Sequence, residues 1–349
     1  PVADPIREVL LDMVNSSDLG YLGSIPELGT SFAGFAKRRW DWTVNPLHVR
    51  AATDVGVAVV ELLRVFTKPG DKVLFSSPIY QNFYTWMRET HVEMVDVPFQ
   101  TGSETSDQIG WSHDWAGIEA AYESGIAVHL LCSPHNPLGK VYTSEELLRI
   151  VELAKQYGVV VISDEIHAPL TFKEQPFIPF LSVSEAAAEV GVAVSAASKG
   201  WNIAGLKCAI IISQTEKMHE KLNQLPPALH NRASLLGAFA TVAAFEKGEP
   251  WLDQAIEILD ENRQLIANLV SARIPSVKYA MPHCSYLAWL DVSALNLGED
   301  PGAVLIEKAK VAFNSGHIYG ALGKSHVRFN FATSPAIITE AIERIARVL

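Results

Sequence analysis

The sequence has no long apolar run and no excess of positive charge, and each absence excludes a class of protein. No apolar stretch reaches the ~18–20 residues that a membrane-spanning helix needs. The 28 lysines and arginines are outnumbered by 39 aspartates and glutamates, which gives a formal net charge of −11. A chain this acidic is a poor non-specific partner for nucleic acid or for an anionic membrane surface. We therefore expect neither as a partner.

Cysteine is also scarce, with three residues that lie far apart: Cys132, Cys208 and Cys284. They form no C-x-x-C pair, and an odd number does not suit a disulfide framework, so the sequence predicts a reducing, cytoplasmic setting. None of the 11 histidines pairs with a cysteine at the spacing of a zinc site, and we expect no bound metal.

What the sequence does have is the composition of a globular protein, with 48% apolar and 19% charged residues. Its 349 residues exceed the ~250–300 that one core usually serves, which predicts two domains. In the middle of the chain, short apolar runs alternate with helical segments, a pattern typical of an α/β sheet covered by helices on both faces. The predicted strands are residues 72–76, 128–132, 159–162, 192–194 and 208–212, the last three as buried parallel strands.

Two helix starts can be recognised. Thr143 and Glu146 form a capping box that opens a helix running to about Gln156, and Gly158 follows as its stop. A second apolar helical pattern begins after Asp54.

The pattern changes near residue 250, which predicts a second, smaller α+β domain. We expect a long bridging helix over residues 252–269, followed by a strand, a helix, a strand and a final helix at residues 285–291, 304–312, 326–331 and 337–348. The predicted division places residues 20–250 in a large domain, and residues 1–19 and 251–349 in the small one.

Polar motifs follow three of the predicted strands. Asn136 lies in the loop after residues 128–132, Asp164 follows residues 159–162, and Lys199 lies in the loop after residues 192–194. Ligands in open α/β sheets bind beyond the carboxyl ends of the strands. We therefore expect an amide, a carboxylate and an amine to meet in one pocket.

The motifs SPHNPLG (133–139), SDEIHAPL (163–170) and SKGWNIAGLK (198–207) resemble the pyridoxal-phosphate (PLP) enzymes of fold type I. Among these the chain is similar to class I/II aminotransferases, and most closely to the MalY/PatB branch of cystathionine β-lyases. The likeness extends from Tyr21 to Phe331. It implies a PLP-dependent transferase-like fold, with a large α/β/α domain around a mostly parallel sheet and a smaller α+β domain.

The resemblance implies a role for each motif residue. Lys199 resembles the lysine that bonds the cofactor aldehyde and then takes the substrate Cα proton. Asp164 resembles the carboxylate that holds a proton on the pyridine nitrogen. Asn136 resembles the amide that binds the ring O3′ oxygen, although Asn-Pro is also common in turns.

Two aromatic residues are assigned to the vicinity of the cofactor. His167 stands where most aminotransferases of this fold have tyrosine, and the Asp-Glu-Ile-His run resembles the C–S lyase branch. The alternative for His167 is a packed core histidine. Tyr80 resembles the ring that stacks on the pyridine, and its alternative is an ordinary core tyrosine.

Four residues are assigned to the cofactor phosphate. Gly56 and Val57 lie at the predicted helix start after Asp54, where main-chain N–H groups suit an anion. By resemblance, Ser198 and Lys207 complete the phosphate cup. Lys207 stands where many aminotransferases have arginine, so the charge is kept while the two-pronged geometry is lost.

The remaining assignments concern the substrate and a second subunit. Arg328 resembles the residue that clamps the substrate α-carboxylate with paired hydrogen bonds. Tyr21 resembles a tyrosine that reaches the phosphate of the neighbouring subunit, which implies a homodimer with shared active sites. Trp201 adds bulk that we expect near the pocket. The family also carries a segment before the position of Pro1 that contributes backbone to the substrate site, and we expect the chain as given to lack it.

These features predict a PLP-dependent C–S β-lyase that acts on L-cystathionine or related cysteine S-conjugates and yields pyruvate and ammonia. The alternative is an aminotransferase for a neutral or aromatic amino acid, which would need a keto acid to complete its cycle. A non-catalytic amino-acid or PLP sensor on the same fold is a third hypothesis, and the lack of a basic DNA-binding segment argues against it.

Overall fold

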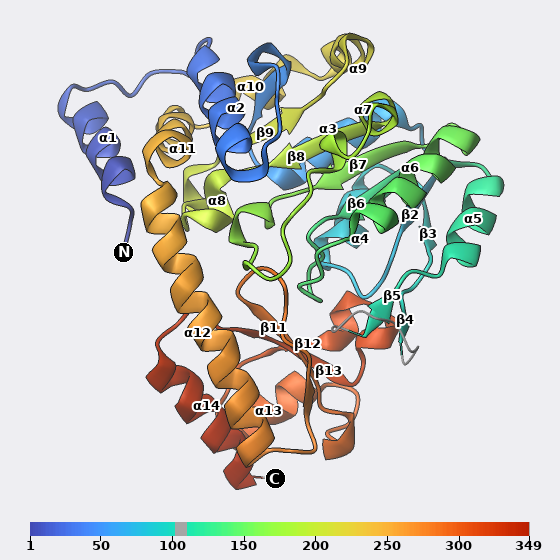
Figure 1. Ribbon diagram of the computed structural model, residues 1–349, viewed down its shortest axis with the longest axis vertical. Helices are drawn as coiled ribbons and strands as arrows, with labels where there is room; N and C mark the ends of the chain where they lie inside the picture. The colour runs from blue at the N-terminus through green and yellow to red at the C-terminus, as the bar shows by residue number, and fades with distance from the viewer. Residues whose placement is uncertain (102–109, 349) are drawn as a thin grey trace.

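The computed structural model describes residues 1–101 and 110–348, and within these ranges the first lobe is built on a seven-stranded sheet (Figure 1). Its strands are β1 (Val49–Ala52), β2 (Lys72–Phe75), β3 (Glu93–Asp96), β6 (Ile126–Cys132), β7 (Val160–Asp164), β8 (Gly191–Ser195) and β9 (Ala209–Ile212). They lie in the order β1-β9-β8-β7-β6-β2-β3. Strands β3, β2, β6, β7 and β8 are parallel, which confirms the predicted α/β class.

One strand runs opposite to the prediction. The sequence predicts residues 208–212 as a further parallel strand, but β9 is antiparallel to β8, and β1 is antiparallel to β9. The connection from β8 to β9 contains only the four-residue helix α8 (Ala197–Gly200) and a short 3-10 turn. A parallel neighbour needs a long crossover to the opposite end of the sheet. Without one, the chain returns in the opposite direction.

The sheet is buried on both faces because each strand alternates its side chains between two cores. Ile211 belongs to the core that includes residues of α3 (Val55–Phe66) and α4 (Asn82–Glu89). Its neighbour Ile210 belongs to the other core, which includes residues of α2 (Pro26–Trp40), α6 (Ser144–Tyr157) and α11 (Leu235–Lys247). Such two-sided burial leaves the strand ends as the accessible part of the sheet.

Helix α6 confirms the predicted capping box. The Thr143 hydroxyl accepts from the Glu146 N–H at 3.2 Å, and a Glu146 carboxylate oxygen accepts from the Thr143 N–H at 2.9 Å. Gly158 follows the helix with φ of 72°, the left-handed conformation that glycine adopts easily.

The remaining elements of the first lobe are short. The α-helices are α1 (Asp4–Asn15), α5 (Trp115–Glu123), α7 (Glu185–Val190), α9 (Glu216–Lys221) and α10 (Pro227–Asn231). Strands β4 (Gln100–Thr101) and β5 (Trp111–Ser112) form a separate antiparallel pair. The 3-10 helices of both lobes are η1 (Pro46–His48), η2 (Ala168–Leu170), η3 (Phe180–Ser182), η4 (Ala204–Leu206), η5 (Leu222–Gln224), η6 (Ser293–Leu295), η7 (Gly316–Tyr319) and η8 (Ala321–Gly323).

The second lobe is an antiparallel sheet with helices. Its strands β10 (Lys278–Tyr279), β11 (Leu287–Asp291), β12 (Asn314–Ser315) and β13 (His326–Asn330) lie in the order β10-β11-β13-β12. Its helices are α12 (Glu249–Arg273), α13 (Pro301–Ala309) and α14 (Pro335–Val348). Helix α13 begins earlier than predicted because the Asp300 carboxylate caps it by accepting from the Ala303 N–H at 3.0 Å.

Helix α12 connects the lobes. Its 25 residues span about 37 Å, and Figure 1 shows it passing from the first lobe into the second. The assignment of residues 1–19 to the small domain stays a prediction; in the structure their helix, α1, packs against α11. Within the described ranges, no helix has both the length and the apolar character needed to cross a membrane.

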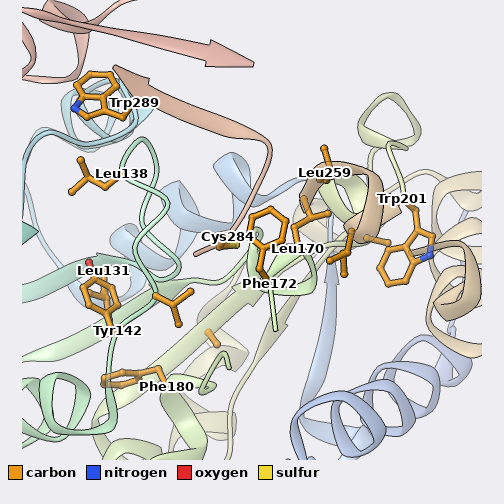
Figure 2. Packing of buried hydrophobic residues seen from close by; sticks show 14 of the residues in the cluster. Leu131, Leu138, Tyr142, Leu170, Phe172, Phe180, Trp201, Leu259, Cys284 and Trp289 are labelled. Atoms are coloured by element: carbon orange, nitrogen blue, oxygen red, sulfur yellow. The ribbon is translucent and has the colours of Figure 1, made fainter. Parts of the chain in front are cut away.

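Trp201 lies in the core and not beside the pocket, contrary to the expectation. Its side chain is fully buried among other apolar residues (Figure 2). Its ring packs edge-on against Phe35 and Phe245. The indole N–H donates to the Gly248 carbonyl at 2.9 Å. Lys199 and Trp201 are two positions apart at the end of α8, so the helical turn directs their side chains to roughly opposite sides.

Candidate active site

A cavity of about 530 Å³ lies at the carboxyl ends of β6, β7 and β8 and is lined by residues from both lobes. Its position agrees with the rule for ligands in open α/β sheets. The structure brings ten of the eleven predicted site residues to this cavity: Gly56, Val57, Tyr80, Asn136, Asp164, His167, Ser198, Lys199, Lys207 and Arg328.

Lys199 lies on α8, directly after β8, so its amine is delivered to the strand ends. Burial lowers the pKa of Lys199, Asp164 acts in the opposite direction, and Arg328 adds to the lowering. The free amine is the form that can bond a carbonyl or accept a proton, and a lowered pKa increases its share near neutral pH.

Asp164 is the last residue of β7, and its carboxyl is buried. One of its oxygens accepts from the Ile166 N–H at 3.1 Å. Burial raises the pKa of Asp164 to about 7, although the Ile166 N–H and the Lys199 charge both lower it. A carboxylate so placed would gain from a cationic N–H group in the cavity, such as a protonated pyridine.

Two of the groups predicted to bind the phosphate contact Asp54, an aspartate that the sequence analysis did not assign to the site. Asp54 caps α3: one carboxylate oxygen accepts from the Val57 N–H at 2.8 Å and the other lies 2.9 Å from Lys207 Nζ. Asp54 thus contacts two of the groups expected to bind phosphate. The N-cap position three residues before Val57 was the available sequence signal.

Gly56 is required by the close approach of Trp86. A Cβ atom at Gly56 would lie 2.9 Å from the indole nitrogen of Trp86, which also lines the cavity. Tyr80 lies edge-on to Trp86, with ring centroids 6.1 Å apart, and its hydroxyl accepts from the Asn82 amide at 2.9 Å. These side chains form an aromatic wall that suits a planar ring.

Arg328 enters the cavity from β13 of the second lobe. Its guanidinium donates to the Oδ1 atoms of Asn136 and Asn314, both at 3.1 Å, and lies 5.0 Å from the Tyr319 ring centroid. Its Nε is buried without a partner. The side chain is therefore held by weak neutral acceptors, and an anionic ligand would be a stronger partner.

His167 is buried at the cavity wall. Its Nδ1 lies 3.0 Å from the Ser285 hydroxyl, and its ring lies edge-on to Tyr286. Burial lowers the pKa of His167 to about 3, and the nearby charges of Lys199 and Arg328 act in the same direction. The imidazole is consequently neutral at physiological pH. Sequence reasoning missed Ser285 and Tyr286 because nothing local links them to residue 167.

Tyr21 is the one predicted site residue outside the cavity. It precedes α2, and 97% of its surface is exposed. Its expected contact is with a neighbouring subunit, so this assignment stays a prediction. Within the described residues, no cluster of three or more His, Cys, Asp or Glu side chains could hold a metal ion.

Comparisons with known proteins agree with this geometry. Residues 7–345 match the family model described as aminotransferase class I and II. The chain is 33% identical to a cystathionine beta-lyase from Corynebacterium glutamicum and 30% identical to the cystathionine beta-lyase PatB from Bacillus subtilis. Each match covers 99% of this chain and 89% of the relative.

The fold is also similar to that of cystalysin from Treponema denticola, whose structure contains pyridoxal 5′-phosphate. The TM-score is 0.93 and the identity 26%, over 100% of this chain and 88% of cystalysin. The matched span includes the cavity and all of the residues placed in it. The chain therefore belongs to the class I and II aminotransferase family of PLP-dependent enzymes.

Proposed function

We propose that the protein is a PLP-dependent C–S β-lyase that acts on L-cystathionine or a related cysteine S-conjugate. With cystathionine and water, the products would be homocysteine, pyruvate and ammonia. The observation that carries the proposal is the cavity that unites Lys199, Asp164 and Arg328 in a chain similar over nearly its full length to relatives named cystathionine beta-lyase.

The residues present fit the cofactor. Asp164 is a buried carboxyl without a strong cationic partner, Lys199 offers an amine of lowered pKa, and the start of α3 offers main-chain N–H groups. Asp164 would hold the ring nitrogen, Lys199 the aldehyde, and Ser198, Lys207 and the start of α3 the phosphate. When bound, PLP supplies the electron sink that stabilises negative charge at the substrate Cα.

Side chains of the protein would bind the substrate and transfer its proton. Arg328 would bind the substrate carboxylate and so orient the Cα–H bond. Lys199 Nζ would take the Cα proton, for which its lowered pKa suits it. The electron pair of the broken Cα–H bond forms a double bond between Cα and Cβ. At the same time the Cβ–S bond breaks, and the sulfur leaves as a thiolate with the Cβ–S electron pair. The remaining three-carbon fragment is released and hydrolyses to pyruvate and ammonia.

The deciding experiment uses purified, PLP-loaded protein with L-cystathionine and no keto acid. We expect continuing, equimolar release of pyruvate and free thiol, and we expect Lys199→Ala to abolish both. Turnover that appears only when a keto acid accompanies an amino acid would replace the lyase by an aminotransferase, the reaction for which the family is named. Binding of PLP without product in either assay would support the sensor hypothesis instead.

The proposal includes a homodimer in which Tyr21 reaches the phosphate site of the partner subunit. The exposed tyrosine supports it, as do the exposed apolar side chains Leu11, Val14 and Leu19 nearby in the sequence. A mixing experiment tests it. Tyr21→Ala and Lys199→Ala are each expected to have low activity alone, whereas their heterodimer has one intact site. Recovery of activity on subunit exchange would support the shared site, and its absence would refute it.

The proposal also covers the cellular location of the protein and the movement of its lobes. We place the protein in the cytoplasm, supported by three cysteines that are all free and buried. We also propose that the lobe containing β11 and β13 moves as the smaller domain, because Arg328 belongs to it and would be drawn toward a bound carboxylate.

A further inference from the structure

We propose that Ser285 is a positioning residue for His167, holding the imidazole so that Nε2 carries its proton toward the cofactor site. Ser285 belongs to the segment that enters β11 in the second lobe, while His167 follows β7 in the first. The inference rests on the proposed place of His167 beside the cofactor, but it does not depend on whether the reaction is elimination or transamination.

The contact is direct and buried. Ser285 is 3% exposed, and its hydroxyl oxygen lies 3.0 Å from His167 Nδ1. The preceding residue, Cys284, donates its thiol to the His167 carbonyl at 3.1 Å. Two consecutive residues from the second lobe thus hold both the ring and the main chain of His167. With Nδ1 taken, Nε2 is the ring nitrogen left for the cavity that His167 lines.

Backbone hydrogen bonds on both sides fix the position of the hydroxyl. The Ser285 N–H donates to the Leu170 carbonyl at 3.0 Å, and the Phe172 N–H donates to the His283 carbonyl at 2.9 Å. Figure 2 shows the labelled side chains of Cys284, Phe172 and Leu170 in the same part of the packed core. The hydroxyl therefore sits on a braced segment and not on a free loop.

The conformation of Ser285 points in the same direction. Its φ is 77°, in the left-handed region where glycine is the favoured residue. A serine there accepts backbone strain, which gathers at functional sites, and Ser285 contacts His167, which lines the cavity. The feature that distinguishes serine from glycine here is the hydroxyl, and its partner in the structure is His167.

The choice of tautomer follows from the charge of the ligands. A neutral imidazole has one N–H donor and one acceptor nitrogen, and the partner of one nitrogen determines which carries the proton. The lowered pKa of His167 keeps the ring neutral. Because PLP and an amino-acid carboxylate both present anionic oxygens, Nε2 gains most as a donor. Nδ1 must then accept, and the Ser285 hydroxyl can donate to it.

The test uses the colour of the PLP-loaded protein, which requires no turnover. A donor that stabilises the cofactor's negative oxygen makes the bound cofactor easier to deprotonate. We therefore expect Ser285→Ala to raise the pH midpoint of the visible colour change by about one unit. Ser285→Ala leaves unchanged the other titratable and charged groups around the His167 imidazole and the cavity, which are Asp164, Lys199, Cys284, Tyr286 and Arg328.

A second variant and two controls separate positioning from packing. Ser285→Gly also removes the hydroxyl but suits the left-handed backbone, so it should give the same shift with better folding. Thr171→Ala removes a hydroxyl that donates to the Ala168 carbonyl and lies 3.7 Å from Cys284 Sγ. It changes the same segment without removing a partner of the imidazole, and it should leave the midpoint unchanged. In a His167→Asn background, removing the Ser285 hydroxyl should add nothing.

An unchanged midpoint in folded Ser285→Gly would overturn the proposal. So would a shift that persists in the His167→Asn background, because the hydroxyl would then act by another route. If the unmodified protein shows no lyase reaction but the Ser285 variants still shift the midpoint, the proposed function is contradicted and the role of Ser285 is supported.

Discussion

The guanidinium of Arg328 donates to Asn136 Oδ1 at 3.1 Å, and this hydrogen bond joins β13 of one lobe to the loop after β6 of the other. The two residues are 192 positions apart in the chain. A bond between the proposed carboxylate clamp and the proposed ring-binding amide places substrate and cofactor recognition in contact. A substitution at either residue should therefore affect both substrate binding and cofactor binding.

Arg328→Lys should lower kcat/KM for the amino-acid substrate by about 10- to 100-fold, chiefly through a higher KM. Lysine keeps the charge, but it loses the planar fork that matches a carboxylate. Steady-state kinetics would measure the change. Asn314→Ala is the matched control, since it removes only the other neutral partner of Arg328 and should have a much smaller effect. An unchanged KM in Arg328→Lys would argue that the carboxylate binds elsewhere.

Asp54→Asn should tighten PLP binding by about 2- to 10-fold. Asparagine remains a good N-cap for α3, but the negative charge that now pairs with Lys207 is removed, which frees the lysine for phosphate. Titration of the cofactor-free protein with PLP, followed by visible absorbance, gives the dissociation constant. Asp114→Asn, at the N-cap of α5, changes the same chemistry away from the cavity and should leave binding unaltered. Weaker binding in Asp54→Asn would mean that Asp54 instead orients Lys207 for the phosphate.

The stability of the cofactor-free protein should rise with pH from about 4.5 to 6.5. Burial lowers the pKa of His129 to about 3 and of His135 to about 4, and burial with neighbouring cations lowers that of His167 to about 3. Below the ordinary histidine pKa of about 6.5, the unfolded chain binds more protons than the folded one. Raising the pH therefore favours folding, by on the order of 1 kcal/mol per pH unit for each group.

Above pH 6.5 the direction should reverse. Burial raises the pKa of Asp164 to about 7 and of Glu165 to about 8, so the folded protein holds protons that the unfolded chain has lost. These carboxyls oppose the histidines at lower pH; at higher pH the two of them outweigh the lowered pKa of Lys199, and stability should fall until about pH 8. Urea unfolding at pH 5, 6.5 and 8 would measure this, and Glu165→Gln should flatten the alkaline side. A stability that still rises from pH 6.5 to 8 would contradict the assignment.

Trp201→Ala should reduce the free energy of unfolding by about 3–5 kcal/mol without changing the preference among substrates. The substitution leaves a cavity beside Phe35 and Phe245 and removes the donor to the Gly248 carbonyl. Trp201→Phe keeps most of the packing and should cost less. Chemical denaturation gives the stability, and the ratio of kcat/KM for two cysteine conjugates gives the preference. A changed ratio would show that this side chain influences the cavity after all.

Features that depend on short-range chemistry could be predicted from the sequence. The capping box of Thr143 and Glu146 sets the start of α6 because both groups lie within one helical turn. The short apolar runs define the central strands, and Asn136, Asp164 and Lys199 meet at their ends because parallel strands deliver their following loops to one edge.

Relationships between distant residues depend on tertiary packing and could not be predicted from the sequence. The direction of β9, the burial of Trp201 away from the cavity and the contact of Asp54 with Lys207 all depend on how the chain returns and packs. The hydrogen bond between His167 and Ser285 spans 118 positions and two lobes. No local pattern encodes such a pair, because its two members are brought together only when the lobes pack against each other.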